Sequence, residues 1–418
     1  MSESLQTFRE VLFTYQPVFD TSKKAWGYAL SFIDDDASKT FTQLSLEKTE
    51  ETRELLALIG NCPDKRFCQA RVIIPFTEEA ILQGDAYALP PSSLYVQLKD
   101  STGFNPALTT MVQQLVEKGY AIAIDDYMAC PENMPLYRFS SIFMTCLADR
   151  EERVTTRQQR LRDITEPAFL AKNIASQKQF QQARSQGYQL FQGVFFQKPK
   201  AGKIRTISAN EAIRFEILEQ LCAEEFDFDT LSNSIAKDAS ISVRLLKLLN
   251  SPAYGPVQEI HSLKQAAVYL GHDHLKNWLR VILLTDSVLP QTTRELLRTS
   301  LLRAKFLEII SNRAGVGNEA DRLFLLGLFS LLDSMYQMPM NRIMDHLEKL
   351  NSEIKMTLNG EITSLTDWLN LSVSMSNSDW PELGSSSARL NLSSDWLMPS
   401  YLSALTWVDT TLQVSTRL

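Results

Sequence analysis

The sequence is short of histidine, cysteine and long hydrophobic runs, and each shortage excludes a class of protein. Only four histidines and five cysteines occur in 418 residues, and the cysteines form no CxxC pair, so neither a zinc knuckle nor a disulfide framework is expected. No apolar stretch approaches the roughly 18 to 20 residues that a membrane helix needs. The first residues, MSESLQTFRE, lack a basic start followed by an apolar core. We therefore expect a cytoplasmic protein without a membrane partner.

An excess of positive charge is also missing. The formal net charge is −7 and the sequence pI is about 5.4, whereas nucleic-acid-binding proteins usually carry a basic patch or a high pI. We therefore expect no nucleic-acid partner. The hydrophobic fraction of 44% and the charged fraction of 22% are those of an ordinary globular protein. At roughly 150 residues per domain, the length predicts two or three domains.

The first half of the chain alternates short apolar runs with amphipathic stretches. VLFTYQPVF and AWGYALSFI are joined by the polar turn DTSKK, which predicts a strand pair. Further apolar runs follow at residues 70–76, 92–98, 120–124, 141–147, 169–175 and 188–196. Before the third of these, PALTTMVQQLVEKG has helical spacing and ends at Gly119. Repeated strands with helices between them predict a closed, largely parallel β/α barrel.

The second half has helical patterns only. The polar segment QKPKAGK (197–203) ends the strand signals, and we place the domain boundary there, with a barrel domain at 1–200 and an all-α domain at 201–418. Ser-rich stretches near the end, SVSMSNSDW and GSSSARLNLSSDW, resemble a linker by composition. Tryptophans interrupt them, however, and tryptophans usually anchor chain to a core, so we keep these stretches inside the folded domain.

The two halves resemble two bacterial signalling domains. YQPVFDTSKKAWGYALSF, GYAIAIDDY and GYQLFQGVFFQKP, in this order and spacing, resemble the EAL domain, the cyclic di-GMP phosphodiesterase barrel. SVRLLKLLNSPAYGPVQEIHSLKQAAVYLGHDHLKNWL resembles the HDOD domain, a helical relative of the HD phosphohydrolases that lacks their metal-binding residues. The chain is thus similar to EAL–HDOD signal-transduction proteins. Its HDOD signature residues are Asn250, Ser251, Pro252 and Gly271, which we interpret as helix stops and turns.

The resemblance to the EAL domain also implies which positions would hold metal ligands, and at most of these positions this sequence has a different residue from the one that the family has. A pair of divalent ions needs several converging oxygen ligands from different strands. Of the acidic cluster only Asp125 and Asp126 remain, together with Gln192 of the Gln-Gly motif, and we interpret them as a vestigial site. The two aspartates are expected to end a strand and accept backbone N–H groups. The substituted ligand positions are Ala29, Pro75, Gln97, Met144 and Ala175.

The helical half lacks the catalytic signature of its enzymatic relatives. Where the resemblance places the His-Asp dyad, LGLFSLLD has Ser330 and Leu331. His272 and His274, two residues apart between helices, have poor spacing for one metal ion. We expect no metal and no cofactor in either half.

These substitutions favour a non-catalytic regulatory scaffold whose partners are other signalling proteins, and the chain is therefore not expected to be an enzyme. The alternative is a sensor that binds cyclic di-GMP or a related nucleotide without cutting it, with Lys172 as the basic side chain at the barrel mouth. An active phosphodiesterase would require the motif alignment to be wrong at four or more positions.

Overall fold

The chain folds into two units, each built around its own core. The computed structural model describes residues 11–34, 70–100, 105–147, 161, 167–197, 209–222 and 292–416, and twelve positions between them: 230, 231, 234, 235, 265, 271, 275, 276, 279, 280, 283 and 284. The first compact unit comprises Met1–Phe196 with Val373–Met398, and the second comprises Gln197–Ser372 with Pro399–Leu418. None of the helices in the described part is long and apolar enough to cross a membrane.

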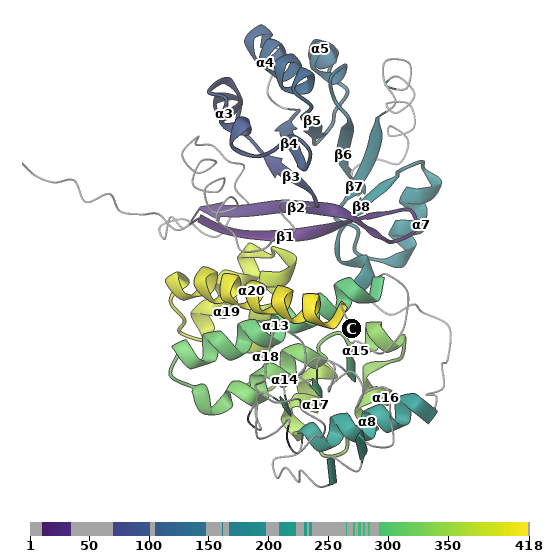
Figure 1. Ribbon diagram of the computed structural model, residues 1–418, viewed down its shortest axis with the longest axis vertical. Helices are drawn as coiled ribbons and strands as arrows, with labels where there is room; N and C mark the ends of the chain where they lie inside the picture. Colours follow the sequence, from purple (N-terminus) through teal and green to yellow (C-terminus); the bar gives the residue numbers. More distant parts are fainter. Residues whose placement is uncertain are drawn as a thin grey trace, which may run out of the picture. The chain divides into compact units, whose positions relative to one another are not determined.

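The first unit is a closed eight-stranded barrel, as the sequence predicted (Figure 1). Strand β1 is antiparallel to both β2 and β8, and every other neighbouring pair is parallel. The strands are β1 Val11–Asp20, β2 Ala25–Asp34, β3 Arg71–Pro75, β4 Leu94–Lys99, β5 Ala121–Asp125, β6 Ile142–Cys146, β7 Ala168–Lys172 and β8 Leu190–Gln192.

Helices on the outside of the barrel connect its parallel strands (Figure 1). In α4, Asn105 caps the N-terminus, Pro106 takes the first turn, and Gly119 follows the C-terminus with a φ of +92°. Leu108, Val112 and Leu115 form its buried face, so the predicted helix over this segment is confirmed. The described helices of this part are α3 Glu78–Leu82, η1 Asp85–Ala88, α4 Pro106–Glu117, η2 Pro131–Asn133, α5 Met134–Tyr137, α7 Gln177–Ser185 and η4 Val194–Gln197.

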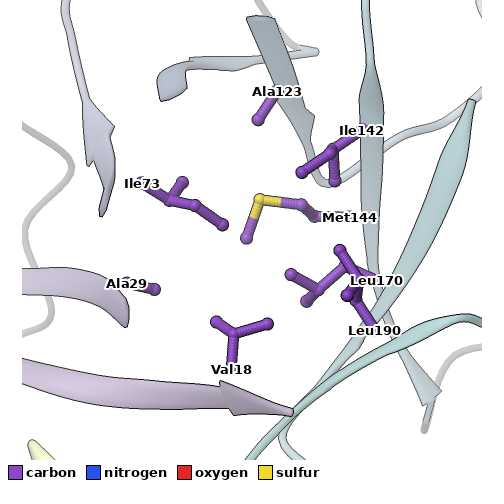
Figure 2. Close-up of a cluster of buried hydrophobic side chains, with 8 residues drawn as sticks. All are labelled: Val18, Ala29, Ile73, Ala123, Ile142, Met144, Leu170 and Leu190. Carbon is purple, nitrogen blue, oxygen red and sulfur yellow. The ribbon is translucent and has the colours of Figure 1, made fainter. Parts of the chain in front are cut away.

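The barrel interior is filled by apolar side chains rather than by a channel. Met144 of β6 lies in the middle of this group, and Figure 2 shows its thioether among side chains from the surrounding strands. The small residues Ala29 and Ala123 leave room for the long methionine, which fits the large-and-small packing of such barrels. The full cluster is Val18, Ala29, Ile73, Ala123, Ile142, Met144, Leu170 and Leu190.

The second unit is helical, as predicted. Helices α13 and α14 pack closely, because Gly327 has no side chain: a Cβ at that position would lie 2.5 Å from the backbone nitrogen of Ala304. The helices described from residue 209 onward, outside the largely undescribed range 223–291, are α8 Ala209–Cys222, α13 Thr292–Arg313, η5 Gly317–Glu319, α14 Ala320–Phe329, α15 Leu332–Tyr336, α16 Met340–Met344, α17 Ser352–Leu358, α18 Thr366–Asn377, α19 Trp380–Arg389, η6 Ser394–Trp396 and α20 Leu397–Thr416.

The Ser-rich stretches form helices instead of a linker. They include the end of α18, most of α19 and all of η6, and Trp380 is fully buried. Residues Val373–Met398 cluster with the barrel rather than with the other helices. The domain boundary predicted at residue 200 stays a prediction, while this segment shows that sequence order and compact units do not coincide.

Replacing Met144 with alanine is expected to destabilise the barrel. The side chain is 1% exposed and its removal leaves a cavity among neighbours held by strands, so the free energy of unfolding should fall by about 2 to 4 kcal/mol. Urea unfolding followed by circular dichroism measures this loss. Met128→Ala is the matched control, because Met128 is 51% exposed and its removal should change little. Equal unfolding midpoints for the two variants would contradict the proposed role of Met144.

Candidate functional site

Polar side chains gather at the carboxyl ends of the parallel strands. Gln97 stands near the end of β4, Asp125 ends β5, Lys172 ends β7 and Gln192 ends β8. These four residues, together with Asp126, which directly follows Asp125, are called the carboxyl-end ring below. In a β/α barrel this end is where ligand-binding and catalytic groups converge, since side chains from different strands meet there.

Lys172 is the charged centre of this ring. Its Nζ donates to Asp126 Oδ1 at 2.8 Å and also to Asp125 Oδ1. Gln97 Nε2 donates to the other oxygen of Asp125, Oδ2, at 2.8 Å. The Lys172 and Asp125 side chains are 16% and 15% exposed, whereas Asp126 is 47% exposed. Asp126 is therefore the carboxylate that can leave Lys172 at least cost in desolvation.

The environment of Lys172 keeps its side chain protonated. Burial by itself would lower the pKa of Lys172, because it disfavours the charged form. The negative charges of Asp125 and Asp126, and the hydrogen bonds to them, outweigh burial and raise the pKa above its ordinary value. The ring therefore contains a fixed cation between two carboxylates.

The residues that follow β5 and β7 both adopt the left-handed backbone conformation. Asp126 has a φ of +51° directly after β5, and Asn173 has a φ of +58° directly after β7. Aspartate and asparagine tolerate this left-handed region better than most other side chains. The turn also brings the backbone N–H of Asp126 to Asp125 Oδ1 at 2.8 Å. Asp125 thus accepts a local N–H group, but its two ring partners, Lys172 and Gln97, come from other strands.

The predicted substituted positions do not all lie together. Ala29 and Met144 belong to the apolar barrel core, and Pro75 ends β3 opposite Gln97 of β4. Ala175 lies after β7, where its backbone N–H donates to Gln179 Oε1 at 2.8 Å. Their status as substituted ligand positions stays a prediction.

The donor set at this end does not fit a pair of divalent metal ions. Ala29, Met144 and Pro75 offer no oxygen ligand from their side chains, Gln97 is neutral, and the Lys172 ammonium already lies between the two carboxylates. Among the residues that the structure describes, no three histidine, cysteine, aspartate or glutamate side chains are grouped as a metal site would require. These residues therefore support no chemical step through a pair of metal ions.

The helical half contains a buried polar cluster next to Ser330. Arg303 of α13 is 2% exposed and donates to Ser330 Oγ at 3.2 Å and to Gln197 Oε1 at 2.9 Å. Ser334 Oγ donates to the backbone carbonyl of Gln197 at 2.5 Å. Burial lowers the pKa of Arg303 to about 9, and the nearby Asp333 carboxylate opposes this shift. The sequence predicted only that a His-Asp dyad is missing here; it gave no local signal that Arg303 and Gln197 meet.

Of the HDOD signature, only Gly271 can be placed. It has a φ of +80°, and its carbonyl accepts the backbone N–H of Leu275 at 3.1 Å. Asn250, Ser251 and Pro252 lie outside the described residues.

Comparison with known protein families decides the identity of the helical half. The sequence pattern of the HDOD domain matches residues 209–358. The second half of the chain carries an HDOD domain. The prediction of an EAL-like barrel followed by an HDOD domain is therefore confirmed.

Two curated relatives span both the barrel and the HDOD domain. Cyclic di-GMP phosphodiesterase CdgJ of Vibrio cholerae is 24% identical over 382 residues, which cover 90% of this chain and 88% of the relative. Uncharacterized protein YuxH of Bacillus subtilis is 26% identical over 406 residues, which cover 94% of this chain and 96% of the relative. Both alignments run through nearly the whole length of the three chains.

Solved EAL structures match less than half of the chain. An EAL domain protein from Listeria monocytogenes is 15% identical, with a TM-score of 0.36 over 44% of this chain and 87% of that chain. The Xanthomonas citri FimX EAL domain in complex with c-diGMP is 12% identical, with a TM-score of 0.36 over 44% of this chain and 85% of that chain.

The prediction from the sequence that the chain is not an enzyme is wrong. The relative that aligns with 90% of this chain is named a phosphodiesterase. The physical reason is that polar groups at a barrel mouth act together. Gln97, Asp125 and Lys172 form one hydrogen-bonded ring, which a comparison of ligand positions one at a time does not evaluate.

Replacing Lys172 with methionine is expected to lower the free energy of unfolding by about 1 to 2 kcal/mol at pH 7, since two carboxylates lose their common cation. The folded state raises the Lys172 pKa, so this stabilisation is complete below the unfolded value of about 10.4 and is lost only as the pH rises through the higher folded value. Urea midpoints of wild type and variant should therefore differ by the same amount from pH 7 to pH 9. Lys178→Met, at an exposed position of α7, is the control. Equal effects of the two substitutions would refute the role of Lys172.

Proposed function

We propose that the protein is a signal-transduction protein that recognises cyclic di-GMP at the carboxyl-end ring and acts on other signalling proteins through its HDOD domain. The observation that carries this proposal is the ring itself: a protonated lysine, two carboxylates and two glutamine amides at the end of the barrel where ligands bind. The name of the Vibrio cholerae relative, which aligns over both domains, supports the choice of nucleotide.

The chemistry of the ring suits this ligand. Cyclic di-GMP carries two negative phosphodiester groups and guanine edges with both donors and acceptors. Lys172 can pair with a phosphate if the exposed Asp126 gives up its hydrogen bond, and the amides of Gln97 and Gln192 can pair with polar base or sugar atoms. Because the phosphate must compete with Asp126 for Lys172, the ring favours moderate rather than very tight binding.

A regulatory scaffold is the second candidate. Lys172 already offsets one of the two negative charges of Asp125 and Asp126 within the protein, so these side chains have partners without a ligand. In this case the HDOD domain, whose family is associated with contacts between signalling proteins, supplies the function. Other signalling proteins are the partners in both candidates.

Isothermal titration of cyclic di-GMP into the full chain, first with magnesium and then with manganese, tests the proposal. The same samples are analysed for linear product, so that binding and turnover are measured together. We expect binding to the wild type and at least about tenfold weaker binding to Lys172→Met, because a charge-assisted contact to phosphate is lost. Lys178→Met should bind like the wild type.

The outcomes separate the candidates. Heat accompanied by product assigns phosphodiester hydrolysis to the chain, and heat that depends on Lys172 places the nucleotide at the ring. Absence of heat at any nucleotide concentration would refute cyclic di-GMP recognition and favour the scaffold. Equal binding by Lys172→Met and the wild type would move the nucleotide away from the ring.

A further inference from the structure

Three groups from distant parts of the chain form a hydrogen-bonded relay inside the first compact unit. Gln192 Nε2 donates to Gln16 Oε1 at 2.8 Å, and Gln16 Nε2 donates to the backbone carbonyl of Asn377 at 2.6 Å. Gln192 belongs to the carboxyl-end ring, Gln16 to β1, and Asn377 to the end of α18. The relay thus joins the ring to a segment 361 residues away from Gln16 in sequence.

The relay fixes the direction of both amides. A backbone carbonyl is only an acceptor, so the atom of Gln16 that faces Asn377 must be the donor Nε2. The other end of the Gln16 amide, Oε1, is then an acceptor, and Gln192 must present its own Nε2 to it. The Asn377 carbonyl therefore determines the orientation of the Gln16 amide, and the Gln16 amide in turn determines that of the Gln192 amide.

The last atom of the relay is Gln192 Oε1. This atom is buried and has no hydrogen-bond partner within the described ranges of the chain. A buried acceptor without a donor costs free energy that a donor from a ligand or a water would recover. The strand register places Gln192 beside Lys172: Ala171 pairs with Phe191, and Lys172 and Gln192 each follow directly.

The turn that carries Asn377 is itself held in place. Ser378 has a φ of +59°, and its hydroxyl is hydrogen-bonded to that of Thr14, a fully buried residue of β1. The backbone N–H of Asp379 donates to the carbonyl of Ser374 at 2.9 Å. The Asn377 carbonyl is therefore a positioned acceptor rather than a chance contact.

We propose that Gln16 and the Asn377 carbonyl are positioning groups that hold Gln192 as a hydrogen-bond acceptor, so that the ring selects a ligand presenting an N–H or O–H donor at this point. For the cyclic dinucleotide, whose recognition rests on the function proposed above, the matching groups are a guanine N–H or a ribose hydroxyl. A phosphate oxygen is disfavoured at Gln192, and Lys172 is left to meet the phosphate.

Gln16→Glu tests this assignment, because its effect depends on protonation. When ionised, the new carboxylate can still accept the hydrogen bond from Gln192 Nε2. Its other oxygen is a second acceptor facing the Asn377 carbonyl, so the hydrogen bond between these two groups is lost. When protonated, the new carboxyl group has one O–H donor and one carbonyl, like the amide it replaces. We expect cyclic di-GMP to bind about tenfold more weakly than to the wild type at pH 8.5 and within about twofold of the wild type near pH 4, which lies below the ordinary glutamate pKa of about 4.3.

Two further variants separate positioning from general loosening of the turn. Gln16→Leu removes the donor and the acceptor together and should weaken binding about tenfold at both pH values. Thr14→Val removes one of the contacts that hold the same turn but leaves the Gln16 amide in place, so it should weaken binding clearly less than Gln16→Leu does. Binding by Gln16→Glu that equals the wild type at pH 8.5, or equal effects of Gln16→Leu and Thr14→Val, would overturn the proposal.

Unfolding without any ligand distinguishes failure of this proposal from failure of the proposed function. The urea midpoint of Gln16→Glu, relative to the wild type, should rise as the pH falls from about 8.5 to about 4, since protonation restores the relay. If the wild type binds no cyclic di-GMP but this recovery occurs, the nucleotide is wrong and the orientation of Gln192 is supported. If the midpoint of Gln16→Glu does not recover, the orientation itself is refuted.

Discussion

Strand β1 is the constraint on which the rest of the barrel depends. It pairs antiparallel with both β2 and β8, and these pairings close the sheet. Its residues alternate between two faces, so Thr14, Gln16 and Val18 share one of them. Val18 fills the barrel core, Gln16 holds Gln192, and Thr14 holds the turn at Ser378. Closure of the barrel, packing of its interior and orientation of the ring thus all depend on one strand.

Charge balance is the second constraint, and it acts at the carboxyl-end ring. Two aspartates at the end of one strand repel each other unless a cation lies between them. Lys172 supplies that cation from within the chain, and Gln97 stabilises the remaining oxygen of Asp125 with a neutral donor. The polar groups that a ligand would meet are therefore already ordered in its absence, which lowers the entropic cost of binding.

The local sequence pattern predicted the barrel well, because a short stretch of sequence is enough to indicate each strand and helix. AIAIDDY, for example, predicted a strand that ends in carboxylates, and β5 ends at Asp125. Local pattern could not predict which distant polar groups meet. Lys172 and Asp125 meet because of the register between β5, β6 and β7, and that register cannot be predicted from any short stretch of sequence. The contact of Gln16 with Asn377 depends on a segment 361 residues away. For the same reason, comparison of single ligand positions was a poor guide to whether the site as a whole is active.

Glutamine recurs at several positions where a neutral side chain orients other polar groups. Gln97 donates to Asp125, Gln16 and Gln192 form the relay, and Gln197 accepts from buried Arg303. An amide has a donor and an acceptor at opposite ends, so a fixed group on one side determines what it presents on the other. A carboxylate in its place would present acceptors on both sides and would add a charge to be balanced. The ring therefore discriminates between ligands by the direction of hydrogen bonds as much as by charge, and that direction is set by a backbone carbonyl at the end of α18.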